Sequence, residues 1–365
     1  MNVPWTRPSL GAFEKDALDR VWDSNWHSQG KEVEAFEKEI CDYIGCKYAV
    51  CVNNGTTALM LAYLTLRLIV EQDKDIVSFI SSSTFIATSN ASKLMSIPFK
   101  PVDVDIKTGL SELKHFEESF QNYDYNVFVP VHLLGNAVNI SVLNILVDKH
   151  KQNSFIIEDA CQAFGTITKD GMIGKNSEMC VFSFHAAKLL STVEGGCIVT
   201  NSKYFYQELK SLRNHGMQEN YECIKSGMNG RMTDLSAALG RAQLQTIEES
   251  IDRRVCIAEI YFEELKDLPI EFVKVPNYVI RPTYSIFAIV CDNPDELKSY
   301  LRLQGIDARR FFPPIESQIC NKNVFDRTKN AQYLTNRLLL LPTGNAITAE
   351  EVKYVCNKIN QFYNK

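Results

Sequence analysis

Short apolar runs rich in valine and isoleucine alternate with helical patterns between about Tyr48 and Thr200. Strands that alternate with helices in this way favour a mostly parallel sheet covered by helices on both faces. The expected strands are Tyr48 to Val52, Ile76 to Ile80, Val127 to Val131, Phe155 to Asp159, Met179 to Phe184 and Cys197 to Thr200. The pattern therefore predicts an α/β fold.

The pattern changes after about Leu268, where several X-Pro pairs disfavour helix. Long helical patterns precede this point, at Thr233 to Thr246 and Ile251 to Leu265. A strand, a helix and a closing helix follow it, at Tyr284 to Val290, Pro294 to Leu303 and Thr348 to Phe362. We expect a large domain over residues 1–245, including the N-terminal segment, and a smaller C-terminal α/β domain over residues 246–365.

Composition narrows the class of protein. The 365 residues are 45% hydrophobic, which is enough for two cores, since a single core stops growing at roughly 250–300 residues. A net charge of -5 gives no basic field for nucleic acid, and small molecules are the expected partners. Eleven cysteines in a long chain without a Cys-x-x-Cys pair indicate reduced thiols.

Targeting segments and metal motifs are not evident in the sequence. The N-terminus lacks an apolar signal core, and no stretch of about 18 apolar residues occurs. We therefore expect a cytoplasmic protein with no membrane partner. The histidines form no i, i+4 pair, and we expect no metal site. They are His27, His115, His132, His150, His185 and His215.

An aspartate ends one of the expected strands, and a lysine follows the end of another. Lys188 follows the run Phe182 to Ala187, shortly before Glu194-Gly195-Gly196, and Asp159 ends its own run. Enzymes that use pyridoxal 5′-phosphate (PLP) need this pair, because the lysine forms a Schiff base and the carboxylate keeps the pyridine nitrogen protonated. Taken alone, Lys188 is a solvated lysine at a strand end and Asp159 a turn or capping residue.

Four further features supply groups that PLP needs. Gly55-Thr56-Thr57, at a strand-to-helix junction, offers N–H groups, hydroxyls and the positive end of a helix dipole to a phosphate, and Ser183 adds a hydroxyl. Gln162 is a donor for the ring oxygen, and Phe85 is an aromatic side chain that can lie on the ring. The alternatives are an N-cap threonine, a strand serine, a surface glutamine and a core phenylalanine.

The order of these pieces resembles the DegT/StrS-type nucleotide-sugar aminotransferases, a branch of the fold-type-I PLP enzymes, over nearly the whole chain. The matching motifs are Ser24 to Gly30, Val33 to Glu37, Tyr48 to Val50, Asn54 to Thr56, Thr84 to Thr88, Val131 to Gly135, Glu158 to Ala163, Ser183 to Gly196, Leu212 to Gly216, Asn229 to Gly240 and Ala308 to Phe312.

The resemblance implies a large PLP-binding domain, a smaller C-terminal domain, and a homodimer with two active sites at the subunit interface. It gives each candidate residue a role: Lys188 bonds to PLP, Asp159 holds the ring nitrogen, Gln162 the ring oxygen, Phe85 stacks on the ring, Gly55, Thr56 and Ser183 bind the phosphate, and Asn229 reaches the phosphate from the other subunit.

The same resemblance bears on the substrate. Family members with histidine at the lysine position are dehydratases, so Lys188 implies amino transfer. His185-Ala186-Ala187-Lys188 with Glu194-Gly195-Gly196 resembles members that aminate C4, and the motifs look most like those of dTDP-4-amino-4,6-dideoxy-D-glucose (viosamine) synthases. The implied reaction moves an amino group from L-glutamate, which leaves as 2-oxoglutarate, to a dTDP-4-keto-6-deoxy hexose.

Three alternatives stay open at this point. The chain is also compatible with a C3 aminotransferase, with an enzyme for UDP- or GDP-linked sugars, and with a PLP-fold regulatory protein that performs no turnover. Arg309 and Arg310 either meet the sugar diphosphate or are ordinary surface arginines, and they are left out of the predicted site.

Overall fold

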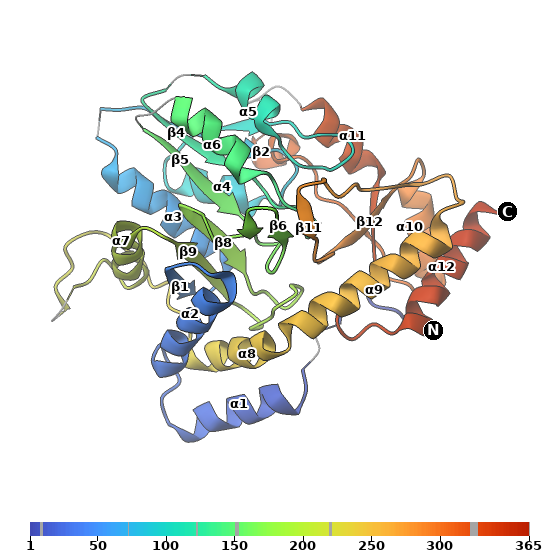
Figure 1. Ribbon diagram of the computed structural model, residues 1–365, viewed down its shortest axis with the longest axis horizontal. Helices are drawn as coiled ribbons and strands as arrows, with labels where there is room; N and C mark the ends of the chain where they lie inside the picture. The colour runs from blue at the N-terminus through green and yellow to red at the C-terminus, as the bar shows by residue number, and fades with distance from the viewer. Residues whose placement is uncertain are drawn as a thin grey trace.

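The computed structural model describes residues 1–7, 10–71, 73–121, 123–149, 153–218, 221–321 and 328–364. Figure 1 shows a large sheet sandwiched between helices and, beside it, a smaller sheet with the C-terminal helices. This arrangement confirms the predicted α/β fold class. The helices are α1 Ala12–Asp23, α2 Lys31–Ile44, α3 Gly55–Ile69, α4 Ala87–Leu94, α5 Leu113–Ser119, α6 Ile140–Lys149, α7 Lys203–Arg213, α8 Asp234–Gln245, α9 Ile247–Leu265, α10 Pro294–Leu303, α11 Lys329–Arg337 and α12 Ala349–Tyr363.

The large sheet has the strand order β1-β9-β8-β5-β4-β2-β3. Its strands are β1 Tyr48–Val52, β2 Ile76–Ser81, β3 Phe99–Val102, β4 Tyr125–Val129, β5 Ser154–Asp159, β8 Met179–Ser183 and β9 Gly196–Thr200. Of these seven strands, only β9 runs in the opposite direction, and it pairs antiparallel with β1 and β8. The other pairs are parallel, so the prediction of a mostly parallel sheet is confirmed.

Two details of the sheet differ from the sequence prediction. The edge strand β3 was not expected, because Pro101 interrupts its apolar pattern and proline is tolerated only where no ladder hydrogen bond is needed. β4 ends at Val129 rather than Val131, and Val131 forms only an isolated bridge to Asp159. The chain thus leaves the sheet two residues early, beside the end of β5.

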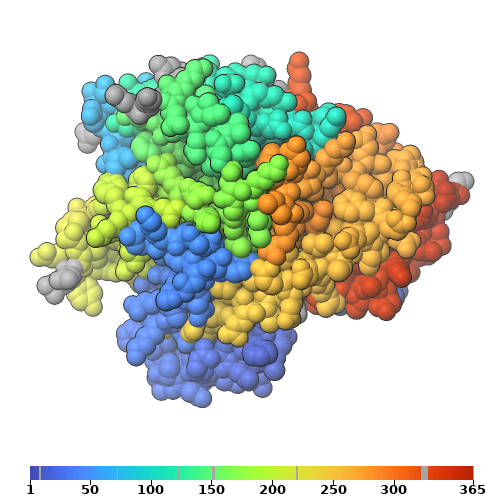
Figure 2. Space-filling model, in the orientation of Figure 1, coloured from blue at the N-terminus to red at the C-terminus, as the bar shows by residue number. Residues whose placement is uncertain are grey.

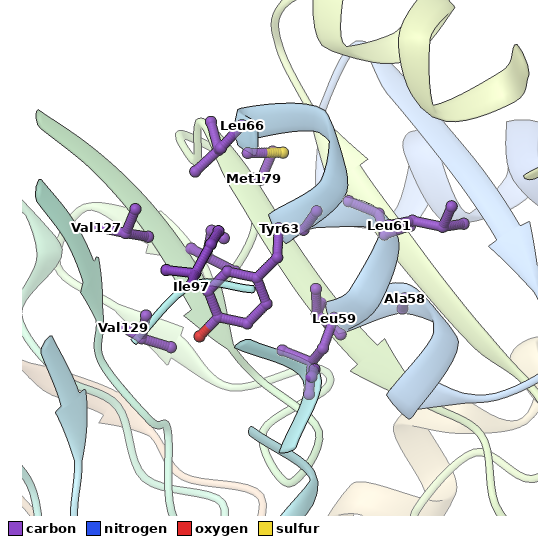
Figure 3. Packing of buried hydrophobic residues seen from close by; sticks show 14 of the residues in the cluster. Ala58, Leu59, Leu61, Tyr63, Leu66, Ile97, Val127, Val129 and Met179 are labelled. Atoms are coloured by element: carbon purple, nitrogen blue, oxygen red, sulfur yellow. The ribbon is translucent and has the colours of Figure 1, made fainter. Parts of the chain in front are cut away.

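One face of the large sheet packs against α3. Val127 and Val129 of β4 and Met179 of β8 meet the fully buried Tyr63 and its neighbours on the helix (Figure 3). The opposite face carries the alternate residues of the same strands, such as Phe128 and Phe182, and is covered by α2, α5 and α6. Because both faces are buried, the strands are continuous apolar runs rather than alternating ones.

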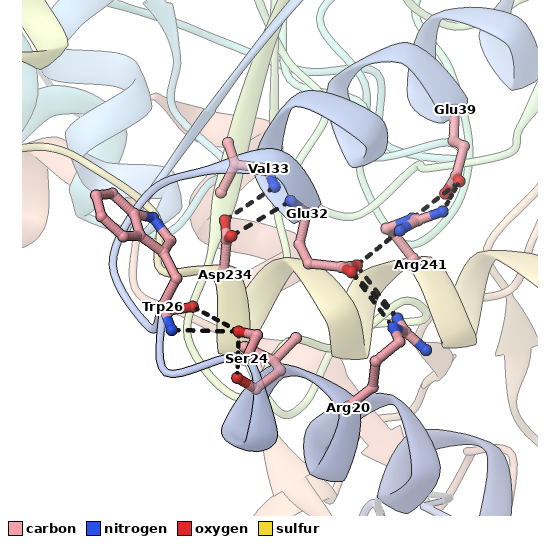
Figure 4. A network of polar contacts seen from close by, with 9 residues as sticks. Arg20, Ser24, Trp26, Glu32, Val33, Glu39, Asp234 and Arg241 are labelled. Atoms are coloured by element: carbon pink, nitrogen blue, oxygen red, sulfur yellow. Dashed lines mark hydrogen bonds and ion pairs between the residues drawn. The ribbon is translucent and has the colours of Figure 1, made fainter.

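Asp234, at the start of α8, holds the first turn of α2. Its carboxylate accepts hydrogen bonds from the N–H groups of Gly30 (2.7 Å), Val33 (3.1 Å) and Glu32 (3.3 Å), as Figure 4 shows for the last two. A helix start leaves such N–H groups without helical partners, and a negative charge there is stabilised by the helix dipole. Asp234 therefore ties α2 to α8.

The same two helices are joined by charged side chains. Arg241 of α8 pairs with Glu32 and Glu39 of α2, and Arg20 of α1 also pairs with Glu32 (Figure 4). Burial opposes ionisation of Glu32, but the hydrogen bonds from Arg241 and Arg20 hold its pKa below the ordinary value. Figure 2 shows α1, in blue, as a ridge along the lower edge of the molecule beside α8.

The smaller sheet has the antiparallel order β10-β12-β14-β13 and packs against α9, α10 and α12. Its strands are β10 Glu271–Phe272, β12 Phe287–Val290, β13 Arg309–Arg310 and β14 Leu338–Leu341, and a third sheet joins β6 Ile167–Thr168, β7 Gly171–Met172 and β11 Val279–Arg281. The N-terminal residues lie against this part of the molecule, since Val3 bridges to Ile306.

Glu178 directly precedes β8, at the end of the large sheet where the inner strands β5 and β8 begin. Its carboxylate accepts a hydrogen bond from Ile156 N–H, and burial raises its pKa from 4.5 to about 7. The ionised form is thus disfavoured in the folded state, so the free energy of unfolding falls as pH rises from about 4.5 to about 7.

We predict that Glu178→Gln removes this part of the pH dependence, because the amide keeps an acceptor for Ile156 N–H but does not ionise. Between pH 4.5 and 8 the wild type should lose at most about 3 kcal/mol more stability than the variant, measured as urea midpoints. The exposed Glu271→Gln serves as control and should keep the wild-type slope. A Glu178→Gln protein with the full wild-type slope would contradict the assignment.

Candidate active site

A cavity of about 440 Å³ lies where several strands of the large sheet end. Ligands in open α/β sheets bind at the carboxyl ends of strands, which is where β1, β2, β5 and β8 deliver their last residues. Most of the predicted site residues line this one cavity: Gly55, Thr56, Phe85, Asp159, Gln162, Ser183 and Lys188. Residues far apart in the sequence are therefore brought to one place by the sheet.

Two predicted residues do not line the cavity. The N–H of Thr57 donates to the side chain of Asn54 at 2.8 Å, and its methyl group lies close to Gly230. Asn229 is exposed and forms a β-bridge with Asn214. Asn229 thus has no contact with the pocket of its own chain, and its predicted role in a second subunit stays a prediction.

The first turn of α3 forms an anion-binding corner. Asn54 accepts the N–H of Thr57 with its side chain and that of Ala58 with its carbonyl group. Among the described residues no acceptor takes the N–H groups of Gly55 and Thr56, which are left for a ligand at the positive end of the helix. The Ser183 hydroxyl lies next to them, since a Cβ placed on Gly55 would be 3.3 Å from Ser183 Oγ.

Gly195 and Gly196 make this corner possible. A Cβ on Gly196 would lie only 2.6 to 2.8 Å from the backbone of Asn54 and Gly55, so β9 passes the α3 turn at a distance that only glycine allows. A Cβ on Gly195 would clash with Thr192 Oγ1 at 2.1 Å. Close backbone packing therefore requires glycine at position 196, and crowding by the side chains of Thr192 and Met232 favours glycine at position 195.

Lys188 sits in a loop that folds back on itself between β8 and β9. Backbone hydrogen bonds join Ala186 N–H to Val193 at 2.8 Å and Thr192 N–H to Phe184 at 2.9 Å. Val193 has φ = 68°, a strained conformation for a β-branched residue. The closed loop presents the partly buried Lys188 side chain to the cavity.

Asp159 is held by two donors at the end of β5. Its Oδ2 accepts the Thr88 hydroxyl at 2.7 Å and its Oδ1 accepts the Cys161 N–H at 3.1 Å, and the residue is only 5% exposed. Burial, with the Asp159 charge as a second cause, raises the pKa of the neighbouring Cys161 thiol. Both carboxylate oxygens are thus fixed, and the group faces the cavity in one orientation.

Gln162 is oriented by the turn that contains Leu134 and Gly135. Its Oε1 accepts the Leu134 N–H at 3.0 Å, which leaves the Nε2 group to donate to a ligand. His132 stabilises the same turn, because its Nδ1 accepts the Val138 N–H while its Nε2 donates to the buried Glu158 at 3.0 Å. The Val131 to Gly135 motif therefore positions Gln162 without reaching the cavity with most of its side chains.

Phe85 is 52% exposed and lines the cavity. Its ring makes an edge contact with Phe312, with centroids 5.2 Å apart. An aromatic side chain with one face left uncovered beside Asp159 and Lys188 is suited to stack on a flat ligand ring. The alternative of an ordinary core phenylalanine does not fit this exposure.

The sequence prediction missed the wall of the cavity that comes from the small domain. This wall contains Arg309, Arg310 and Phe312, with Ile286 and Leu340 beneath them, and Trp5 from the N-terminal segment. The sequence motif Arg309 to Phe312 is equally compatible with surface arginines, and only the fold places Arg309 and Arg310 at the cavity. No signal in the sequence marked Trp5, which reaches the cavity only through the packing of residues 1–7 on the small domain.

The residues present fit PLP. The cavity joins a lysine amine, a fixed carboxylate, an oriented amide donor, an exposed aromatic ring and a phosphate corner in which glycine is sterically required. The part of the chain that the structure describes holds no group of three or more histidine, cysteine or acidic side chains arranged for a metal ion, and His150 lies outside it. Within that part no helix has the length and apolar character needed to cross a membrane.

Comparison with known proteins agrees with a cavity suited to PLP. A family model described as the DegT/DnrJ/EryC1/StrS aminotransferase family matches residues 8–360. The chain is 31% identical over 366 residues to GDP-perosamine synthase of Escherichia coli O157:H7, covering 99% of this chain and 98% of that protein. It is 29% identical over 368 residues to dTDP-4-amino-4,6-dideoxy-D-glucose transaminase of Shigella dysenteriae, covering 98% of both.

A solved structure supports the fold. DesV of S. venezuelae superposes with a TM-score of 0.93 at 27% sequence identity, covering 100% of this chain and 99% of that one. The superposition covers the whole chain, and it confirms the predicted fold-type assignment.

We predict that Lys188→Ala abolishes covalent attachment of PLP and lowers transamination by roughly 10²–10⁴-fold or more, because the anchor and the proton carrier are the same amine. Attachment is measured by borohydride reduction followed by mass spectrometry, and turnover by release of 2-oxoglutarate. The exposed Lys203→Ala is the matched control and should behave as wild type. A folded Lys188→Ala protein with normal turnover would refute the role of Lys188.

Proposed function

This chain belongs to the DegT/DnrJ/EryC1/StrS aminotransferase family, and we propose that it transfers an amino group from L-glutamate to C4 of a nucleotide-linked 4-keto-6-deoxy hexose. The family uses PLP, which confirms the predicted cofactor, and its aminotransferase character decides against a regulatory protein without turnover. The observation that carries the proposal is the meeting of Lys188, Asp159 and the α3 phosphate corner in one cavity.

The residues of the cavity divide the chemistry among them. PLP, when bound, supplies an electron sink for the pair released as a substrate carbon loses its proton. With PLP in the cavity, Asp159, fixed by Thr88 and Cys161, would keep a proton on the pyridine nitrogen, and Gln162 Nε2 would donate to the ring oxygen. Lys188 Nζ takes the proton from Cα of glutamate and in the second half of the cycle returns one at C4 of the sugar.

Two observations support the proposed acceptor: the sequence motif around Lys188 and the named activity of a related protein. The His185-Ala186-Ala187-Lys188 context resembles C4-specific members, and one relative is named for a 4-amino-4,6-dideoxy sugar on dTDP. The cavity wall formed by Phe85, Phe312 and Leu340 is apolar, which suits a 6-deoxy sugar that lacks the C6 hydroxyl. We therefore propose dTDP-4-keto-6-deoxy-D-glucose as the preferred acceptor.

A GDP-linked 4-keto-6-deoxy hexose is the second candidate. It is favoured by the 31% identity to a GDP-perosamine synthase, which is slightly higher than the 29% identity to the dTDP-sugar enzyme. The nucleotide base lies far from the reacting carbon and contributes mainly binding energy, so the two candidates share the same chemistry at C4.

The position of Asn229 supports a site shared between two subunits. It is exposed and lies away from the pocket of its own chain, although the resemblance assigns it to the PLP phosphate. Exposed apolar side chains on α1 and the following segment, Phe13, Trp22 and Trp26, offer a surface that a second copy can cover. We propose a homodimer in which Asn229 completes the phosphate corner of the partner.

With glutamate as donor, we predict that kcat/KM is highest for dTDP-4-keto-6-deoxy-D-glucose and at least about 100-fold lower for the 3-keto isomer. Moving the carbonyl by one ring carbon takes it out of the roughly 3–3.5 Å attack range of the amine. The measurement is mass-detected amination of a panel of dTDP-, GDP- and UDP-linked keto sugars. Preference for a 3-keto sugar would contradict C4 specificity, whereas preference for the GDP sugar would change only the nucleotide.

The shared site predicts complementation between two inactive variants. Lys188→Ala and Asn229→Asp chains, co-expressed and purified as a heterodimer with two affinity tags, should form one site with both changes and one intact site. Up to about half of the wild-type activity per dimer should return. Each homodimer is measured alone as the control, and a proven heterodimer without activity would place Asn229 in its own chain's site or outside any site.

A further inference from the structure

The N-terminal residues reach the active-site cavity because the small domain holds them. Val3 N–H donates to Gly305 O at 2.9 Å, Asp307 N–H donates to Val3 O at 2.9 Å, and Thr343 N–H donates to Trp5 O at 3.1 Å. Gly305, at φ = 77°, allows this approach, since a Cβ there would lie 2.5 Å from Met1 O. The segment of residues 2–5, held by the isolated bridge between Val3 and Ile306, therefore delivers Trp5 to the cavity wall in a fixed place.

Trp5 in turn holds Arg309. The Arg309 guanidinium lies over the Trp5 ring, 4.6 Å from its centroid, and both side chains line the cavity. The flat guanidinium stacks on an indole face while its N–H groups stay available at the edge. The Arg309 side chain remains 55% exposed, so its donors are accessible to a ligand rather than buried in the protein interior.

Arg309 differs from Arg310 in exposure and in partners. The Arg310 side chain is 22% exposed, its Nη2 donates to the carbonyl groups of Thr335 (2.8 Å) and Asn336 (2.9 Å), and its Nη1, which has no hydrogen-bond partner among the described residues, lies 3.1 Å from Asp295. Lys188 lies at the cofactor end. Among the described residues Arg309 forms one ion pair, with the half-exposed Asp307 at 3.2 Å, which is two positions away on the same segment. Such an exposed ion pair contributes little to stability, so a phosphate group can replace Asp307 as the partner of Arg309.

We propose that Arg309, positioned by Trp5, binds the diphosphate of the nucleotide sugar. This inference rests on the proposed function, because it assumes an acceptor that carries a diphosphate. The keto carbon must lie near Lys188, deep in the cavity, and the diphosphate on the sugar's other side then points toward the opening. Arginine presents two parallel N–H donors to phosphate oxygens, which makes it the fitting residue at that position.

A basic hollow outside the cavity gives a matched control. Lys298 and Arg302 of α10 line this hollow together with Arg309 and Arg310, but they do not line the cavity. Arg302→Gln therefore removes one positive charge from the same surface without touching the cavity wall. It separates a specific contact of Arg309 from a general effect of surface charge.

Equilibrium binding tests the contact without turnover. The PLP-loaded dimer is titrated with dTDP by calorimetry, in the wild type and in Arg309→Gln, Arg309→Lys and Arg302→Gln. Loss of a charge-assisted hydrogen bond should weaken dTDP binding about 10- to 100-fold in Arg309→Gln and less in Arg309→Lys, which keeps the charge. Arg302→Gln should bind dTDP as the wild type does. Equal binding by Arg309→Gln and the wild type would overturn the proposal.

Single-turnover kinetics then assign the contact to one half of the reaction. The glutamate half and the keto-sugar half are followed separately through the absorbance of the cofactor. The apparent dissociation constant should rise about 10- to 100-fold for the sugar in Arg309→Gln and by a much smaller factor for glutamate. A similar rise in both halves would overturn the proposal, because it would indicate a site for the glutamate carboxylate or general damage to the cavity.

Trp5 is tested as a positioning residue by non-additivity. Trp5→Leu should weaken dTDP binding in the wild-type background but add little in the Arg309→Gln background, since it acts through Arg309. Fully additive losses would remove Trp5 from the proposal. A wild-type enzyme that reacts with glutamate but aminates no nucleotide sugar would instead show that the proposed function is wrong, and the inference would fall with it.

Discussion

The architecture depends on the contact between the start of β9 and the first turn of α3. Gly196 passes so close to Asn54 and Gly55 that any side chain would displace the backbone. This contact brings Ser183, at the end of β8, against the α3 N-terminus, and it fixes both ends of the loop that carries Lys188. One packing constraint thus places both the phosphate corner and Lys188. This explains why Gly195 and Gly196 follow the lysine so closely in the sequence.

The large sheet and the small domain contribute different halves of the site. The carboxyl ends of β1, β2, β5 and β8 supply the groups that fit PLP. The opposite wall comes from β13, β14 and the N-terminal segment, which Val3 and Trp5 anchor to the part of the molecule built on the smaller sheet. The first half is suited to a cofactor common to a family, and the second half is suited to distinguish substrates.

Two buried polar pairs support the half of the site that is built on the large sheet. Glu37 and Arg213 form an ion pair that also accepts the Cys51 N–H and donates to the Cys51 carbonyl, so α2, α7 and β1 are joined at one buried point. His132 and Glu158 form a second buried pair that supports the turn holding Gln162. Since each of these groups has partners, the cost of burying it is offset, and breaking one pair would leave an uncompensated polar group.

The sequence alone determined the elements and the chemistry that lie within short segments. Apolar runs fixed β1, β2, β5, β8 and β9 to within two residues, because strands buried on both faces need little context, and the end of each run marked where Asp159 and Lys188 stand. The same local pattern missed β3, whose proline weakens the strand signal.

Only the tertiary structure decided what meets across the chain. Thr57 has the residue type of a phosphate ligand, yet its N–H is taken by Asn54, and nothing in the local sequence shows that competition. Trp5 and Arg309 are separated by most of the chain and touch because the N-terminal segment packs beside Ile306 through an isolated β-bridge from Val3. Contacts of this kind depend on how whole elements pack, and a pattern read along a single chain carries no information on distance between its ends.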